Sequence, residues 1–186
     1  REVKMLELAS AYGVFATGGL RNDPVSILKV TNTQNKTLYE YRKTDGRKVL
    51  SPQIAYLITN ILSDNSARTL AFGPNSYLVI PGKTVAVKTG TTDKKRDNWT
   101  FGYTSSFVVG VWVGNNDNSP MNQTITSGVT GAAPIWNRII RMALKGKNDE
   151  EFNKPDNLNQ VEIDAFAGPL PYGSQPKRTD IYVKGT

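Results

Sequence analysis

The sequence predicts a mixed α/β domain in which a mainly antiparallel sheet is flanked by helices. Three observations support this: a β-branched run leads into Lys88-Thr89-Gly90, two further strand-like segments meet at a Ser105-Ser106 turn, and amphipathic helical segments lie before and after them in the chain. With 186 residues, of which 38% are hydrophobic, the chain is long enough for one domain of ordinary size and can fill a core.

The first predicted elements are a helix and a hairpin. Apolar side chains recur at helical spacing at Met5, Leu8, Tyr12 and Phe15. Gly18-Gly19 then ends the predicted helix. Two extended segments, residues 25–33 and 37–42, follow with a polar turn between them. They predict a hairpin that projects from the main body.

A second helix is predicted to begin at Ser51-Pro52, because a hydroxyl cap and a first-turn proline both favour a helix start. One apolar stripe lies along it, formed by Ile54, Leu57, Ile58, Ile61 and Leu62. Its last turn runs into Ser63-Asp64-Asn65. A loop rich in Gly, Pro and Asn, residues 73–82, then leads to the strand that carries Lys88.

The last predicted elements are two strands, a helix and a tail. Aromatic residues at positions 99, 101 and 103 alternate with smaller ones, which indicates a strand with one aromatic face. Residues 107–113 are almost continuously apolar, as expected for a central strand covered on both faces. A helix around residues 135–143 ends at Gly146, and we expect the polar tail beyond it to be extended along the surface or poorly ordered.

Composition excludes several kinds of chemistry. The chain has no histidine and no cysteine, so His-dependent triads, thiolate catalysis, disulfides and zinc sites built on these residues are ruled out, and we expect no metal and no cofactor. The net charge of +7 is spread over scattered groups with acidic residues among them. We interpret this positive charge first as an ordinary solvated surface and second as attraction to an anionic cell envelope. Nucleic-acid binding is the third interpretation.

The stretch Val85 to Thr92 carries the strongest functional pattern. Its β-branched residues favour a strand, and Gly90 lets the backbone of a ligand lie close against it. A Lys-Thr-Gly triplet on a strand is one of three motifs of penicillin-binding proteins and serine β-lactamases, the others being S-x-x-K and S-x-N. Residues 96–104 and 109–117 resemble the strand pair after this triplet in the transpeptidase domain of bifunctional (class A) penicillin-binding proteins. The resemblance extends from Leu6 to Thr186.

This resemblance implies a β-lactamase or D,D-transpeptidase fold, of which the chain is the C-terminal portion only. Residues 1–146 would be the C-terminal part of the transpeptidase domain, and residues 147–186 an extended C-terminal tail. Lys88 would be catalytic, and the backbone N–H of Thr91 would form half of the oxyanion hole.

The resemblance also implies a substrate-binding set, which comprises Thr89, Gly90, Thr91 and Thr92, with Trp99 lining the cleft. Side chains alternate on a strand, so Lys88 and Gly90 should face one way and Thr89 and Thr91 the other. Their convergence on one cleft is therefore an implication of the resemblance alone. Trp99 and Trp112 are expected in the core, although Trp99 lies close enough to Lys88 in hairpin order to line the cleft. Tyr103 is a weaker cleft candidate.

The chain also contains literal matches to the other two motifs. Ser26-Ile27-Leu28-Lys29 satisfies S-x-x-K, but a lysine can activate a serine only from the same face of a helix, and this segment reads as a strand. Ser63-Asp64-Asn65 satisfies S-D-N, but it falls at a helix end only 25 positions before Lys88. Both matches are interpreted as coincidences, and the nucleophilic serine is expected on an upstream part of the domain.

The implied function is peptidoglycan cross-linking by a serine D-Ala-D-Ala transpeptidase, with peptidoglycan stem peptides and β-lactams as ligands. The alternatives are a D,D-carboxypeptidase or β-lactamase hydrolase, and a non-catalytic module that binds cell-wall peptide. The implied location is extracytoplasmic, in the bacterial cell envelope. The upstream half of the same domain is the implied partner, and membrane contact is expected only through that upstream part.

Overall fold

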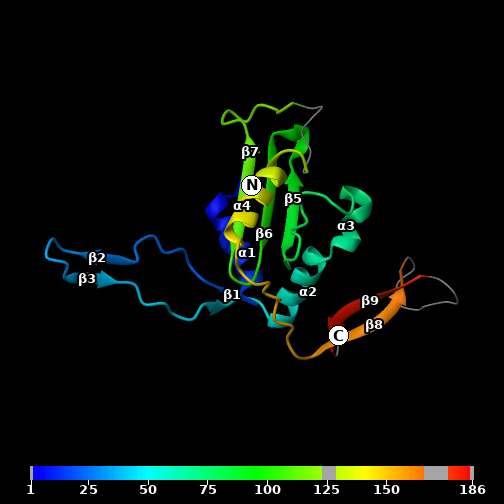
Figure 1. Cartoon of the computed structure of the whole chain (residues 1–186), viewed down its shortest axis with the longest axis horizontal. Helices are drawn as coiled ribbons and strands as arrows, with labels where there is room; N and C mark the ends of the chain where they lie inside the picture. The colour runs from blue at the N-terminus through cyan, green and yellow to red at the C-terminus, as the bar shows by residue number, and fades with distance from the viewer. Residues whose placement is uncertain (1, 123–128, 166–175, 185–186) are drawn as a thin grey trace.

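A computed structural model describes residues 2–122, 129–165 and 176–184 of this chain. Its central feature is a three-stranded antiparallel sheet in the spatial order β5-β6-β7 (Figure 1). The strands are β5 (Ala86–Thr91), β6 (Asp97–Tyr103) and β7 (Val108–Gly114). The mixed α/β class with an antiparallel sheet and flanking helices is confirmed.

The prediction of a central strand at residues 107–113 is wrong in one respect. Within the described residues β7 pairs only with β6, so β6 is central and β7 lies at an edge. The apolar run is explained by coverage of both faces, because β7 contacts α1 (Met5–Ala16) as well as α4 (Ala132–Ala143). A run of apolar residues reports burial of both faces, which helices can provide as well as strands.

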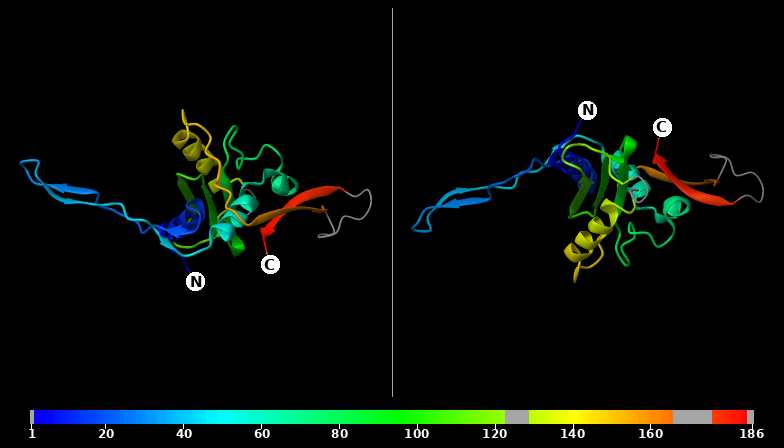
Figure 2. Two further views of the ribbon diagram at one scale, coloured as in Figure 1. Left: turned by 90° about the horizontal axis from the view of Figure 1, so that it is seen from below. Right: turned by 90° about the horizontal axis from the view of Figure 1, so that it is seen from above.

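Helices α1 and α4 lie on opposite faces of the sheet (Figure 2). On the α1 face, the ring of Tyr12 stacks on Phe101 with a centroid distance of 5.1 Å. On the α4 face, Trp136 is fully buried against the sheet. Gly102 is required there, because a Cβ at this position would lie 2.3 Å from Trp136 Cζ2. The main core cluster is on this second face.

Two consecutive helices, α2 (Pro52–Ser63) and α3 (Asn65–Phe72), precede the sheet. Ser51 caps α2 as predicted, since its Oγ accepts a hydrogen bond from Ile54 N at 3.2 Å. A second helix directly after α2 is not expected from the sequence. It begins because the Asp64 carboxylate accepts a hydrogen bond from Ser66 N at 2.8 Å, which caps a second helix directly after the first.

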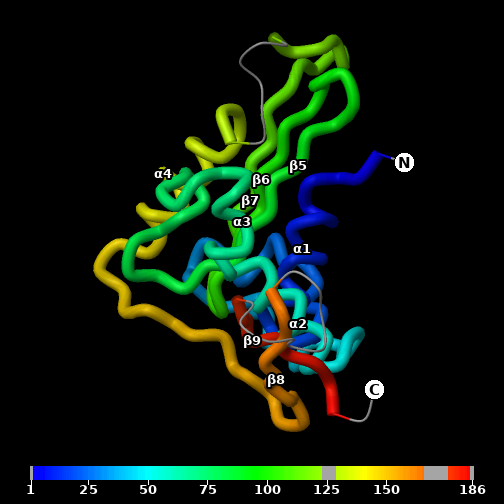
Figure 3. The backbone as a smooth tube through the Cα atoms, turned by 90° about the vertical axis from the view of Figure 1, so that its right-hand side faces the viewer, coloured from blue at the N-terminus to red at the C-terminus, as the bar shows by residue number. Residues whose placement is uncertain are grey.

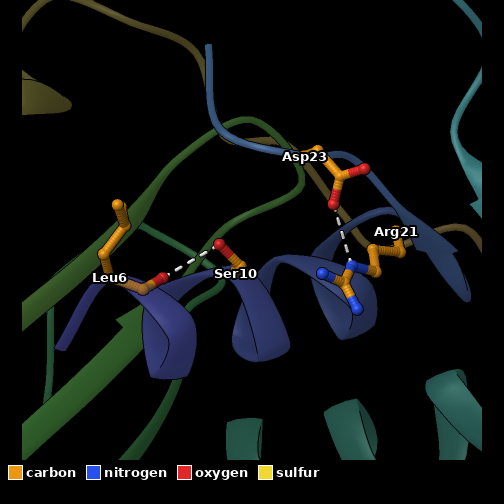
Figure 4. A network of polar contacts seen from close by, with 4 residues as sticks. All are labelled: Leu6, Ser10, Arg21 and Asp23. Atoms are coloured by element: carbon orange, nitrogen blue, oxygen red, sulfur yellow. Dashed lines mark hydrogen bonds and ion pairs between the residues drawn. The ribbon is translucent and has the colours of Figure 1, made fainter. Parts of the chain in front are cut away.

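The predicted hairpin is confirmed, and it projects well away from the sheet (Figures 1 and 2). Its paired strands are shorter than expected and are β2 (Lys29–Thr31) and β3 (Thr37–Glu40), with β1 (Leu20–Arg21) and β4 (Arg47–Lys48) paired at its base. Polar contacts beside the base are local: Ser10 Oγ donates to Leu6 O at 2.9 Å, and Arg21 Nε donates to Asp23 Oδ1 at 3.0 Å (Figure 4). These contacts do not connect the hairpin to the sheet.

The C-terminal tail contains strand pairing that is not expected from its sequence. Strands β8 (Leu158–Asp164) and β9 (Lys177–Val183) form an antiparallel hairpin beside α2 (Figure 3). Gln53 Nε2 at the start of α2 donates a hydrogen bond to Asp156 O at 3.2 Å. This bond connects the segment just before β8 to α2. Among the described residues, no helix is both long enough and apolar enough to cross a bilayer.

Candidate active site

Strand β5 has one edge that no other strand covers within the described part of the chain. Thr92 N donates to Asp97 O at 3.0 Å, so the N–H of Thr92 points toward β6. Backbone amides alternate in direction along an antiparallel strand, and therefore the N–H groups of Thr91 and Thr89 point to the free edge. Val87 lies two positions before Thr89, so its backbone groups point to the same side of the strand. Its carbonyl does point away from β6, because it accepts a hydrogen bond from Arg68 Nη1 of α3 at 3.3 Å.

A cavity of about 1120 Å³ lies beside β5 between α1 and the ends of β6 and β7. Five of the predicted site residues line it, namely Lys88, Thr89, Gly90, Thr92 and Trp99. Thr91 is not among the lining residues, and its N–H lies at the free edge of the strand. The fold thus brings a cationic side chain and the free strand edge to one hollow.

The pleat of β5 separates the predicted residues as alternation requires. Thr89 is 8% exposed and shares its face with the core residue Val87, whereas Lys88 is exposed on the opposite face across from Phe101. The Lys88 Nζ donates to the carbonyl of Thr89, which keeps the ammonium group next to the free edge. Thr89 reaches the cavity because it lies at the rim of the sheet.

Gly90 is not required by the packing of this chain. A Cβ at this position would meet only Trp99 Cβ, at 3.8 Å, which is an ordinary contact, and its φ is not in the left-handed region. The absent side chain instead leaves space over the strand beside Lys88. That space suits a ligand backbone that approaches the strand closely.

The hydroxyl of Thr92 is used within the turn that joins β5 to β6. Thr92 Oγ1 donates to Asp97 Oδ2 at 2.9 Å and accepts from Asp97 N at 2.8 Å, across the short helical turn η1 (Asp93–Lys95). Asp97 Oδ1 also accepts from Trp112 Nε1 at 2.8 Å. Thr92 therefore lines the cavity while its hydroxyl stabilises the turn.

Two aromatic residues differ from expectation. Trp112 was expected in the core, but it lines the cavity and its ring centroid lies 6.2 Å from that of Trp99. The register pairs these two residues directly, so the alternation of both strands was the signal that could have found it. Tyr103, the weaker cleft candidate, is fully buried, and its hydroxyl lies 2.9 Å from Thr59 Oγ1. Burial raises the pKa of Tyr103 to about 12.

The structure places both literal serine motifs outside this cavity. Ser26 is not in a strand as expected but in an exposed bend before β2, and Lys29 Nζ forms an ion pair with Glu40 Oε1 at 3.2 Å. Ser63 is the last residue of α2, where its Oγ donates to Asn60 O at 3.1 Å. Neither serine shares a helix face with a lysine that could activate it.

The chemistry available here is recognition of an extended, anionic ligand. The free edge provides main-chain donors and acceptors, and Lys88 provides positive charge beside them. In the parts of the chain that the structure describes, no three His, Cys, Asp or Glu residues are grouped so as to hold a metal ion. The polar groups that line the cavity are amides, hydroxyls, the ammonium group of Lys88 and the carboxylates of Glu2 and Asp97, of which Asp97 is hydrogen-bonded to Thr92 and Trp112.

Comparisons with known proteins give the same family as the motif. Residues 2–141 match the family described as "Penicillin binding protein transpeptidase domain". Penicillin-binding protein 1A of Clostridium tetani is 30% identical over 97% of this chain and 23% of its own length. The chain thus spans about a quarter of the curated relatives it matches.

Two solved structures share the fold. The crystal structure of penicillin-binding protein 1A from Haemophilus influenzae aligns with a TM-score of 0.81 and 22% identity, over 99% of this chain and 32% of that one. An imipenem acyl-enzyme complex of penicillin-binding protein A from M. tuberculosis aligns with a TM-score of 0.59 and 25% identity, over 74% of this chain and 30% of that one. The chain belongs to the penicillin-binding protein transpeptidase domain family.

Proposed function

We propose that this chain supplies the Lys-Thr-Gly strand and one oxyanion donor of a serine D-Ala-D-Ala transpeptidase that cross-links peptidoglycan. The observation that carries the proposal is the free edge of β5, where the N–H of Thr91 points away from β6 beside the exposed ammonium group of Lys88. An extended peptide can pair with such an edge through its main chain.

In the proposed reaction the β5 edge binds the substrate, and the nucleophilic serine is on a part of the domain that these 186 residues do not include. That serine attacks the carbonyl carbon of the penultimate D-Ala, and the oxygen that becomes negative accepts a hydrogen bond from Thr91 N. The carbon–nitrogen bond breaks, D-Ala leaves with a proton, and the serine holds the acyl group. The amine of a second stem peptide then attacks the ester, loses a proton and releases the serine. A β-lactam acylates the same serine.

The residues of β5 have separate tasks in this scheme. Lys88 attracts the terminal carboxylate of the donor peptide, because opposite charges in a partly enclosed cavity interact more strongly than in water. Gly90 leaves room for the ligand backbone. Losing one oxyanion donor costs on the order of 100-fold to 1000-fold in rate, so the orientation of the Thr91 N–H is the most sensitive feature.

The relatives support this assignment. They are named as penicillin-binding proteins, and one solved neighbour is an acyl-enzyme complex with imipenem. By analogy, we place this domain at the outer face of the cytoplasmic membrane, with stem peptides and β-lactams as ligands and the remainder of the transpeptidase domain as its partner. Hydrolysis of the same acyl-enzyme would leave only a shortened peptide, and peptide binding without catalysis would leave no product and no penicillin adduct, so the experiment below separates both alternatives from transpeptidation.

The test is covalent labelling with a fluorescent penicillin, read by intact mass, on the 186-residue chain and on the full-length polypeptide that contains it. We expect one adduct on the long chain and none on the short one. Acylation of the short chain at Ser26 or Ser63 would contradict the proposed location of the nucleophile. With D-Ala-D-Ala peptides and an acceptor amine, a cross-linked product supports transpeptidation, whereas only the shortened peptide would indicate a hydrolase.

Lys88→Ala tests the cation in the long chain. We expect the acylation rate to fall by about 10-fold to 100-fold, the value of a hydrogen bond to a charged group. Lys36→Ala is the matched control, because Lys36 is an exposed lysine in the β2–β3 connection and does not line the cavity. Equal rates for both variants would exclude Lys88 from the site.

A further inference from the structure

Asn98 is a buried amide that joins the end of β5 to the start of α4. It has 0% exposure and lies directly across from Thr91 in the sheet register. Its Nδ2 donates to Thr91 Oγ1 at 3.0 Å, and its Oδ1 accepts from Ala132 N, the first residue of α4, at 2.6 Å. No sequence motif assigns a role to Asn98.

The direction of the Asn98 amide is set by a backbone group. Ala132 N–H can only donate, so the atom that faces it must be the amide oxygen, and the NH2 group must face Thr91. The site is also too tight for the amide to turn. A Cβ on Gly131 would lie 2.5 Å from Asn98 Oδ1, so the loop before α4 closes directly over the side chain.

This direction determines what the hydroxyl of Thr91 can do. Because Thr91 Oγ1 accepts the hydrogen bond from Asn98, the hydroxyl proton of Thr91 remains available to donate. The Thr91 side chain is exposed, and within the described residues no acceptor for its proton is found. A ligand carboxylate at the free edge of β5 can accept that proton.

We propose that Asn98 is a positioning residue, which holds the Thr91 hydroxyl as a donor to the carboxylate of the bound peptide or β-lactam. The inference rests on the proposed function and deepens it, since it names the residue that sets the polarity of the carboxylate site. Asn98 does not touch the ligand. It acts through Thr91 and is itself anchored by the backbone of α4.

The experiment compares Asn98→Asp with Asn137→Asp in the full-length polypeptide. A carboxylate at position 98 still accepts from Ala132 N but has no proton to donate, so the Thr91 hydroxyl turns to donate to it. Asn137 is a matched control: it is 9% exposed, it lies on α4, and its Nδ2 donates to Tyr77 O at 2.8 Å, away from Thr91. Both variants lose a buried amide donor. Only the change at Asn98 turns the hydroxyl proton of Thr91 away from the ligand carboxylate.

Rapid-mixing kinetics with a fluorescent penicillin give the dissociation constant before acylation and the limiting acylation rate. We expect Asn98→Asp to raise the dissociation constant by about 10-fold to 100-fold, the effect of one hydrogen bond to a charged group, and Asn137→Asp to leave it unchanged. Thr91→Val should raise it to a similar extent. The double variant should bind no more weakly than Thr91→Val alone, because both changes remove the same donor.

Equal dissociation constants for Asn98→Asp and Asn137→Asp would overturn the inference, as would multiplicative effects in the double variant. If Asn98→Asp does not fold, Thr91→Val decides, and an unchanged dissociation constant in that variant overturns the inference. An unmutated full-length protein that takes no adduct would overturn the proposed function, and this inference with it. Adduct formation with normal rates in every variant would overturn this inference alone.

Discussion

Replacement of Gly102 by alanine should destabilise the fold because the glycine faces the largest buried side chain. An added Cβ would lie 2.3 Å from Trp136 Cζ2, 2.8 Å from Cε2 and 3.0 Å from Ala86 O. Trp136 is 0% exposed and is packed between the sheet and α4. Because the indole is fully buried, it or the helix that carries it must shift to relieve these contacts.

The expected cost follows from two opposing terms. Overpacking a well-packed core typically costs about 1 to 3 kcal/mol, and the short contacts of Gly102 with an aromatic ring and a carbonyl oxygen place it at the upper end. Alanine in a strand recovers roughly 0.5 to 1 kcal/mol of backbone entropy relative to glycine. We therefore expect a net loss of about 2 kcal/mol in the free energy of unfolding.

Urea unfolding followed by tryptophan fluorescence measures this loss, and Gly90→Ala is the control. Gly90 is in the same sheet, but its added Cβ would meet only Trp99 Cβ at 3.8 Å, so the free energy of unfolding should stay equal or rise by up to roughly 0.5 kcal/mol. Equal unfolding midpoints for the two variants would refute the packing argument. A loss in Gly90→Ala as large as that in Gly102→Ala would refute the conclusion that Gly90 is free of packing constraints.

Three further predictions concern stability. The folded-state pKa of Tyr103 is about 12 against 10 when unfolded, so the free energy of unfolding should fall by about 2 to 3 kcal/mol between pH 10 and pH 12. Tyr103→Phe should remove this pH dependence and cost about 1 to 2 kcal/mol at neutral pH, because Thr59 Oγ1 loses its buried partner; an unchanged alkaline transition would contradict this. Arg68→Met should cost about 1 to 2 kcal/mol in urea unfolding, because the carbonyl of Val87 loses its donor, and no change would show that water replaces the guanidinium. Ser51→Ala removes the cap of α2 and should cost about 1 kcal/mol by the same assay, whereas Ser51→Asp should not.

The elements that the sequence predicts well are those with a strong local cause. The helix at Ser51 and the hairpin after Pro24 each depend on residues close together in the chain, namely a cap and a polar turn. Helix α3 is not predicted from the sequence, because its start depends on the cap at Asp64, and Asp64 also stands in a literal S-D-N motif. The residues Ser63-Asp64-Asn65 match S-D-N whether Asp64 caps a helix or belongs to a catalytic motif, so the match alone does not separate the two roles.

The candidate site was predicted in part. The Lys-Thr-Gly triplet identified Lys88, Thr89 and Gly90 as neighbours of a cleft, and the structure places all three at one cavity. Asn98 could not be found in this way, because a single asparagine in a strand has no pattern. Its contacts with Thr91 and Ala132 join residues that are 7 and 34 positions away.

The sequence by itself determined the family, the antiparallel strands and the residue types of the β5 edge, because periodicity and motif spacing are local properties. The tertiary structure alone decided which edge of β5 is free, which faces of the sheet the helices cover, and which way the Asn98 amide points. The physical reason is that a hydrogen bond or a packed ring needs two partners. When those partners lie on different elements, only the folded chain brings them within contact distance.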